Sequence, residues 1–206
     1  MENTSQAVLF SVRRLTKKFP NGIKGAAGYE ALSGIDLDIF EGECLVVAGA
    51  NGSGKTLLMR MLAGLLEPTE GEIRFRGKAI AECGKLLRSS VGLVFQDSDA
   101  QILGETVEED IRFGPENLKL PESEIKSRLE QTLAALELAE KRGFSARRLS
   151  GGEKRRLAVA GILAMGCETV IMDEPFANMD WPGVIQVLKI ITALKQSAKT
   201  IIVLTH

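Results

Sequence analysis

The sequence predicts an α/β fold: a mostly parallel sheet forms the core, joined by an N-terminal antiparallel β subdomain and a helical insertion. Three observations lead to this prediction. Short runs in the first third of the chain alternate apolar and polar residues, which is typical of half-exposed strands. Four other runs are continuously apolar, which is typical of strands covered by helices on both faces. Between residues 106 and 164 the apolar residues have largely helical spacing.

The antiparallel subdomain is predicted from three segments of the first third. Residues 7–14 have the composition of a strand, and residues 35–39 alternate Ile and Leu with Asp. Residues 72–76 alternate in the same way. Between the first two segments, residues 20–25 contain one proline and two glycines, so a loop is expected there.

The parallel sheet is predicted from four apolar runs, which are residues 44–48, 91–95, 170–172 and 201–204. Helical patterns follow several of them, for instance at residues 56–66 and 184–195. In the insertion, residues 122–138 place leucine and isoleucine at near-helical spacing, with charged residues on the other face. A nucleotide-binding α/β core with an inserted helical lobe is therefore expected.

Composition limits the class of protein. The chain has 206 residues, 45% of them hydrophobic and 26% charged, which suits one well-buried globular domain and argues against a disordered chain. The formal net charge of −1 argues against nucleic acid as a partner. No apolar run approaches the roughly 20 residues that span a membrane, and no secretory signal is expected. The three separated cysteines predict reduced thiols in a cytoplasmic protein without a zinc site.

The clearest motif follows the run at residues 44–48. Residues 49–56, Gly-Ala-Asn-Gly-Ser-Gly-Lys-Thr, fit G-x-x-x-x-G-K-[ST]. Glycines allow the backbone amides to turn around a phosphate, and the N-terminus of the following helix adds positive potential. Lys55 is then placed to reach the β- and γ-phosphates, and the Thr56 hydroxyl to bind Mg²⁺. The core is therefore expected to be that of a P-loop NTPase of RecA-like type.

A second apolar run ends in two carboxylates, Asp173 and Glu174. Asp173 is expected to hold Mg²⁺, directly or through water, and Glu174 to orient the attacking water or accept its proton. Alone, an apolar run that ends in acidic turn residues is a weak signal. Together with the phosphate loop it predicts a magnesium-dependent phosphoryl-transfer site.

A third motif, Leu-Ser-Gly-Gly-Glu at residues 149–153, has two interpretations. Ser150 and Glu153 have the spacing of a helix capping box, which is a complete structural explanation. The same hydroxyl and two glycines at a helix N-terminus also form an anion site that could hold a γ-phosphate.

These three motifs together resemble the ATPase subunit of ABC transporters over essentially the whole chain. The resemblance identifies residues 49–56 as Walker A, residues 170–174 as Walker B and residues 149–153 as the signature. It implies Gln96 as the Q-loop residue, which links Mg²⁺ and the attacking water to the helical insertion, and His206 as the switch histidine that contacts the γ-phosphate. The catalytic set it implies is Lys55, Gln96, Glu174 and His206, and the Mg²⁺ set is Thr56, Gln96 and Asp173. The implied ATP-binding residues are Phe19, Asn51, Gly52, Ser53, Gly54, Lys55, Thr56, Leu57 and Asp180, with Ser150, Gly151 and Gly152 against the partner's ATP.

The adenine-stacking aromatic has two candidates. Phe19 matches the family position, whereas Tyr29 competes with it, and a core or rim role for Phe19 is the structural alternative.

Residues 96–103 and 106–118 are similar to a subgroup, the energy-coupling-factor and cobalt/nickel-type ATPases. This resemblance implies a subunit that powers import of a vitamin or a transition-metal ion from the cytoplasmic face of the membrane. The implied partners are a second ATPase subunit, in a head-to-tail dimer, and an integral membrane subunit, which the segment at residues 96–113 would contact. No nucleic acid is implied.

The resemblance also sets the expected organisation and shows departures from it. Residues 1–206 are expected to form one domain, with core and β subdomain at about 1–96 and 165–206 and a helical subdomain at about 97–164. The C-terminal part of the family domain is not represented in these residues. Glu153 stands where the family usually has Gln, and Ala-Asn-Met-Asp at 177–180 differs from the commoner D-loop.

Two rival functions and one charge cluster stay open at this point. A soluble ABC ATPase acting on ribosomes or DNA usually has tandem cassettes or a long coiled coil, and a regulatory subunit binds ATP with little turnover.

The basic cluster is expected to be a solvated helical face; it comprises Lys141, Arg142, Arg147, Arg148, Lys154, Arg155 and Arg156.

Overall fold

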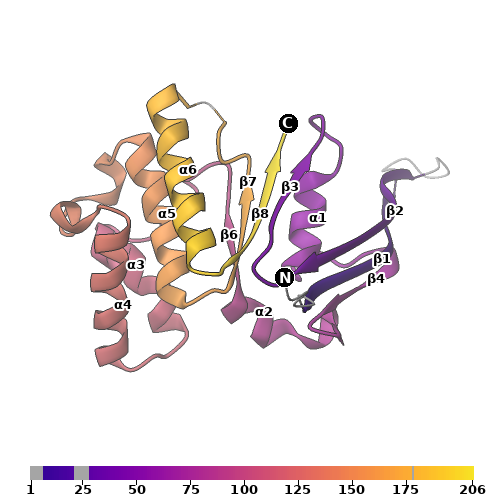
Figure 1. Cartoon of the computed structure of the whole chain (residues 1–206), viewed down its shortest axis with the longest axis horizontal. Helices are drawn as coiled ribbons and strands as arrows, with labels where there is room; N and C mark the ends of the chain where they lie inside the picture. Colours follow the sequence, from indigo (N-terminus) through magenta and orange to yellow (C-terminus); the bar gives the residue numbers. More distant parts are fainter. Residues whose placement is uncertain (1–6, 21–27, 178) are drawn as a thin grey trace, which may run out of the picture.

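The computed structural model describes residues 7–20, 28–177 and 179–206, so most of the predicted loop at 20–25 and Asn178 lie outside the described residues. Two four-stranded sheets form the framework (Figure 1). The first has the order β2-β1-β4-β5 and is antiparallel throughout. Its strands are β1 (Val8–Phe19), β2 (Tyr29–Phe40), β4 (Glu70–Phe75) and β5 (Lys78–Ala79).

The second sheet is parallel and has the order β3-β8-β7-β6. Its strands are β3 (Cys44–Ala48), β6 (Val91–Val94), β7 (Thr169–Asp173) and β8 (Thr200–Thr205). Because parallel strands end at the same edge, the segments that follow β3, β6, β7 and β8 meet there, at the top of Figure 1. The predicted motif residues 49–56, 96, 174 and 206 follow these strands, and Asp173 is the last residue of β7.

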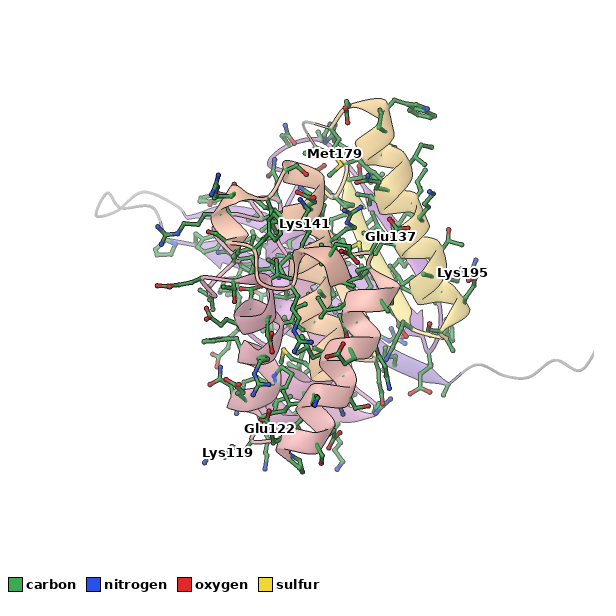
Figure 2. The ribbon with its side chains drawn as sticks, turned by 90° about the vertical axis from the view of Figure 1, so that its left-hand side faces the viewer. Lys119, Glu122, Glu137, Lys141, Met179 and Lys195 are labelled. Carbon is green, nitrogen blue, oxygen red and sulfur yellow. The ribbon has the colours of Figure 1, made fainter. Side chains whose placement is uncertain are left out.

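Helices cover the parallel sheet. In Figure 1, α5 and α6 lie on one side of it and α1 on the other, while Figure 2 shows α4 and α6 on the helical side of the molecule. The helices are α1 (Lys55–Leu62), α2 (Gly84–Ser90), α3 (Val107–Asn117), α4 (Glu122–Ala135), α5 (Gly151–Met165) and α6 (Trp181–Gln196), and three short 3-10 turns join them at Ile80–Glu82, Ala139–Lys141 and Ala146–Arg148.

Alternation along the central strands divides the interior into two cores. Val170 and Met172 of β7 belong to a cluster that includes residues of α3 to α6, whereas Ile171 belongs to a cluster with α1 and the antiparallel sheet. All five residues of β7 are buried, as the apolar run predicts. The sheet is thus fixed from both faces, and its C-terminal edge is a rigid base for the motifs.

The structure corrects several details of the predicted elements. β3 is not buried on both faces, because it lies at the edge of its sheet and leaves Val46 58% exposed. β2 begins at Tyr29, earlier than predicted. Register shifts in its pairing with β1 interrupt the alternation of apolar and polar residues, so the sequence pattern did not reveal the first part of the strand. α1 ends at Leu62, shortly before Gly64 adopts a φ of +69°. The helix predicted over residues 122–138 ends at Ala135, and α2 was not predicted.

Of the helices in the described residues, none combines the length and the apolar character needed to cross a membrane.

Candidate functional site

The phosphate loop joins the end of β3 to the start of α1. Gly54 precedes the helix with a φ of +93°, a conformation that residues with a side chain rarely adopt. A Cβ atom at Gly54 would also lie 2.5 Å from Cδ2 of Leu32 and 2.9 Å from the carbonyl oxygen of Ala31. Both the backbone angle and the close approach of β2 therefore explain glycine at this position.

A cavity of about 410 Å³ opens over this loop. Its lining combines residues 51–57 with Tyr29, Glu30 and Ala31 of β2, and with Gln96, Asp173 and Glu174 from the neighbouring strand ends. The structure thus brings together the predicted phosphate loop, both carboxylates and the predicted Q-loop glutamine around one space.

Lys55 lies at the centre of this arrangement, and its side chain is 9% exposed. Its ammonium donates to the carbonyl oxygens of Gly49 at 2.5 Å and Ala50 at 3.2 Å. The same Nζ lies 3.4 Å from Oε1 of Glu174. The positive charge is therefore held between the loop and the carboxylate, where it can interact with a phosphate group.

The Thr56 hydroxyl donates to Oδ2 of Asp173 at 2.9 Å. The other carboxylate oxygen, Oδ1, is buried and has no hydrogen-bond partner among the described residues. A buried carboxylate oxygen without a partner is costly unless something binds it, and carboxylate and hydroxyl oxygens are ligands that Mg²⁺ prefers. Asp173 and Thr56 therefore fit a magnesium ion, which usually takes few protein ligands and completes its shell with water and phosphate.

Glu174 follows β7 with a φ of +48°, a strained angle for a residue with a side chain. Its N–H donates to the carbonyl oxygen of Leu204 at 2.9 Å, which holds the turn against β8. The carboxylate lies between Lys55 and His206, whose Nδ1 is 2.8 Å from Oε2. The side chain of Glu174 is 11% exposed and that of His206 is 63% exposed. A carboxylate fixed in this way can act on a water molecule at the cavity.

The predicted signature lies over a different cavity, of about 780 Å³. Ser150 caps α5: its hydroxyl accepts the N–H of Glu153, while the Glu153 carboxylate accepts the N–H of Ser150 at 2.8 Å. Asp180 caps α6 by accepting the N–H of Gly183 at 3.0 Å and lines the same cavity. Among the described residues, the phosphate loop does not contribute to this lining.

Gln96 connects the two spaces. It follows β6 by two residues, is exposed, and lines both the cavity over the phosphate loop and the cavity over Ser150. The capping-box and anion-site interpretations of Ser150 are thus compatible, because a capped helix N-terminus faces an open cavity.

Of the two aromatic candidates, Tyr29 lines the cavity over the phosphate loop, and Phe19 is not part of the lining. The two rings are paired across β1 and β2 and stack with centroids 5.5 Å apart. Tyr29 is 59% exposed, so its free face is available to a flat ligand, and Phe19 supports it from behind.

Arg155 was not recognised as a functional residue, and the prediction of a solvated basic face is wrong for it. It is 7% exposed and donates to the carbonyl oxygens of Pro175 at 2.7 Å, Gln96 at 3.0 Å and Glu174 at 3.4 Å. Burial lowers the pKa of its guanidinium. Helical spacing could have located it, because Arg155 shares a face with the apolar Ala158, Val159 and Ile162.

Known proteins match this chain over most of its length. The family model described as ABC transporter matches residues 32–177. The chain is 40% identical over 201 residues to the cobalt import ATP-binding protein CbiO of Rhodobacter capsulatus, covering 96% of this chain and 70% of that protein. It is 41% identical over 182 residues to the energy-coupling factor transporter ATP-binding protein EcfA of Methanocaldococcus jannaschii, covering 87% of this chain and 65% of that one.

Two solved structures are similar over almost the whole chain. One is cbiO1 of Clostridium perfringens, part of the ABC transporter complex cbiONQ, with a TM-score of 0.86 and 35% identity over 98% of this chain and 79% of that one. The other is a dimeric ATP-binding cassette in a post-hydrolysis state with ADP and Pi, with a TM-score of 0.82 and 27% identity over 96% of this chain and 88% of that one. A family match over most of the chain, with relatives at about 40% identity, shows that this protein belongs to the ATP-hydrolysing subunits of ABC transporters.

Proposed function

We propose that this chain powers an ABC importer of the energy-coupling-factor type, which takes up a vitamin or a transition-metal ion. Two kinds of support favour this subgroup. The relatives at about 40% identity carry the names cobalt import and energy-coupling factor. The segments at residues 96–103 and 106–118, on which the subgroup resemblance rests, contribute part of the lining of a cavity on the helical lobe, and α5 contributes the rest.

The observation that carries the proposal is that the phosphate loop and the Ser150 segment line separate cavities. The phosphate loop and Glu174 line one cavity, while Ser150 and Asp180 line another. One chain does not close its own signature over its own phosphate loop, so two chains arranged head to tail each complete the other's site. The dimeric structural neighbour with ADP and Pi is in line with this arrangement.

The proposed mechanism assigns a role to each side chain of the first cavity. Lys55 holds the β- and γ-phosphates, and Thr56, Asp173 and Gln96 would hold Mg²⁺. The ion, when bound, neutralises charge on the phosphates. Glu174 orients the attacking water and accepts its proton, and His206 holds the Glu174 carboxylate from the opposite side to Lys55.

The partner subunit completes the site in this proposal. Its Ser150 segment binds the γ-phosphate through the hydroxyl and the helix N-terminus, so ATP joins the two chains and hydrolysis releases them. The alternating association then moves a membrane subunit, and the chain works as a peripheral protein at the cytoplasmic face of the membrane.

The membrane subunit is proposed to dock on the helical lobe. Leu103 is 64% exposed and Phe113 is 47% exposed, and both line a cavity of about 120 Å³ with Gly114 and Met165. Leu103 in this apolar surface lies only seven residues after Gln96 in the sequence. A helix of the membrane subunit that docks here would therefore lie close to the residues that respond to ATP. The structural neighbour cbiO1 is described as part of the ABC transporter complex cbiONQ, which supports the existence of a partner subunit.

Two experiments test the proposal. Purified protein should hydrolyse ATP, and Glu174→Gln should lower kcat at least about 100-fold while ATP affinity stays within about threefold. Affinity purification from solubilised membranes should recover an integral membrane protein, and Phe113→Asp should abolish that recovery. Leu65→Asp is the matched control, because Leu65 is 63% exposed and lies outside this surface. Normal hydrolysis by Glu174→Gln, or recovery of a ribosomal or DNA complex instead, would contradict the proposal.

A further inference from the structure

Arg155 is a buried cation that no carboxylate neutralises among the described residues. Its Nη1 donates to the carbonyl oxygens of Pro175 and Glu174, and its Nη2 donates to the carbonyl oxygen of Gln96. The third nitrogen, Nε, is buried without a partner in the described part of the chain. All six other basic-cluster residues form ion pairs or lie exposed, so Arg155 has a distinct environment.

Burying an arginine against neutral carbonyl groups is costly, since the charge loses its hydration without gaining an opposite charge. An apolar side chain would fill the same space on α5 at lower cost. What the guanidinium supplies is a planar fork that bonds two separate segments at once, the turn after β7 and the turn after β6. An ammonium group on a lysine is a point donor and cannot reproduce this geometry.

Two neighbouring contacts tie the segment that follows β6 to α5. Lys154 forms an ion pair with Asp99, three residues after Gln96. Gln101 donates to the carbonyl oxygens of Leu93 in β6 and Ala158 in α5, at 3.1 and 3.4 Å. Residues 96–101 are thus fastened to α5 at three points, of which the Arg155 contact is the most deeply buried.

Arg155 lies on the same helix, α5, that Ser150 caps. Ser150 caps this helix and lines the cavity that faces the partner in the proposed dimer. Arg155, within the first two turns, donates to the backbone carbonyl oxygens of Gln96, Glu174 and Pro175. In Figure 1, α5 runs along the parallel sheet beside β6 and β7, whose ends carry these two residues. A helix of this length moves as a rigid element.

We propose that Arg155 is a positioning residue that fixes Gln96 and Glu174 relative to Ser150, so that the two ATP sites of the dimer respond together. The inference rests on the head-to-tail dimer proposed above. Through Arg155, a displacement of the Ser150 segment by the partner's γ-phosphate reaches the catalytic groups that act on the chain's own ATP. The coupling is reciprocal, because ATP bound on the chain's own phosphate loop then favours the placement of Ser150 that binds the partner's ATP.

The test uses two substitutions at one position. Arg155→Met keeps an unbranched side chain without the charge, and Arg155→Lys keeps the charge without the fork. Arg88→Met is the matched control, because Arg88 on α2 is exposed and lines neither cavity. Four quantities are measured for each variant: the melting temperature, the Kd for ADP, the kcat and KM of ATP hydrolysis, and the ATP concentration for half-maximal dimer formation in a Glu174→Gln background, by light scattering.

We expect Arg155→Met to keep KM and the Kd for ADP within about threefold while kcat falls at least about tenfold. The ATP concentration for half-maximal dimer formation should rise at least about fivefold, because Ser150 is no longer fixed relative to Gln96 and Glu174. Arg155→Lys should recover part of both losses, and Arg88→Met should match the unchanged protein. If Arg155→Met does not fold, Arg155→Lys decides, with an expected fall in kcat of at least about threefold at a nearly unchanged melting temperature.

Two results would overturn the inference. One is a kcat within about twofold of the unchanged protein with an unshifted ATP requirement. The other is a loss of ADP affinity in parallel with kcat, which would indicate a general role in folding. A protein that hydrolyses ATP but never forms an ATP-dependent dimer contradicts the proposed function instead, whereas a normal dimer unaffected by Arg155→Met contradicts only the coupling role.

Discussion

The two oxygens of Asp173 have different environments, and this difference has a testable consequence. Oδ2 accepts the Thr56 hydroxyl, whereas Oδ1 is buried without a partner in the described residues. Asp173→Asn keeps the shape and removes the charge that a cation needs. We expect the Mg²⁺ concentration for half-maximal ATP hydrolysis to rise at least about tenfold, while ADP binding in EDTA stays unchanged. Asp36→Asn, a change at an exposed carboxylate of β2, is the control, and an unshifted Mg²⁺ requirement would remove Asp173 from the metal site.

The stacked pair Phe19 and Tyr29 provides a second prediction at this scale. Because Tyr29 lines the cavity and Phe19 supports it, Tyr29→Ala should weaken ATP binding about three- to tenfold, the usual value of an aromatic stack. Phe19→Ala should have a smaller effect, through loss of support for the tyrosine ring. Calorimetry with ATP measures both, and Tyr29→Phe should bind normally. A larger loss for Phe19→Ala than for Tyr29→Ala would return the adenine contact to Phe19.

At the scale of single elements, the N-terminus of α5 depends on an ionised cap. Hydrogen bonding from the Ser150 N–H lowers the pKa of Glu153 below its ordinary value of 4.5. Since the folded-state pKa is the lower one, ionised Glu153 contributes stability above about pH 4.5, and this contribution is lost as pH falls through the folded-state pKa.

Glu153→Gln isolates this contribution, because an amide oxygen still accepts the Ser150 N–H but does not titrate. The other ionisable groups are the same in both proteins and cancel in the comparison. Urea unfolding at neutral pH should give a lower free energy of unfolding for Glu153→Gln, by a few tenths to about 1 kcal/mol. The difference should shrink below pH 4.5; a difference that grows with acidity would be inconsistent with an ionised cap.

The contact between β6 and α5 leaves no room for a side chain at Gly92. A Cβ atom there would lie 2.1 Å from Cγ2 of Ile162, so Gly92→Ala must push the strand and the helix apart. We expect the free energy of unfolding to fall by about 1–3 kcal/mol. Gly143→Ala is the control, because a Cβ atom there meets nothing within 4 Å and the φ of Gly143 is not positive. Equal stability of the two variants in urea would contradict this packing.

For the molecule as a whole, the sequence predicted the existence of the sheets and motifs better than the residues at which the strands and helices begin and end. β7 and β8 could be predicted because their apolar runs are buried on both faces, whereas β3 has the same composition but lies at an edge. The phosphate loop and the Asp173–Glu174 pair follow from local spacing and strand order. Arg155 could not be recognised from charge alone, because its role depends on carbonyl groups 59 and about 20 residues away, which only the folded chain brings together.

Because the phosphate loop and Ser150 line separate cavities, the proposed head-to-tail dimer can be tested with pairs of variant chains. Lys55→Ala disables the phosphate loop of a chain, and Ser150→Arg disables the signature that the chain offers to its partner. Each variant alone should be inactive as a homodimer. A head-to-tail dimer that contains one chain of each kind retains one site with an intact phosphate loop and an intact signature.

Mixing the two inactive variants should therefore restore ATP hydrolysis. Random pairing puts half of the chains into mixed dimers, each with one of its two sites intact, so the restored rate approaches about a quarter of the unchanged protein. A chain that carries both substitutions is the control. Mixed with the unchanged protein, it forms dimers in which neither site is complete, so the activity falls below the value expected if the unchanged protein were only diluted. If each chain closed its own site, the results would be reversed, with no recovery in the first mixture and only dilution in the second.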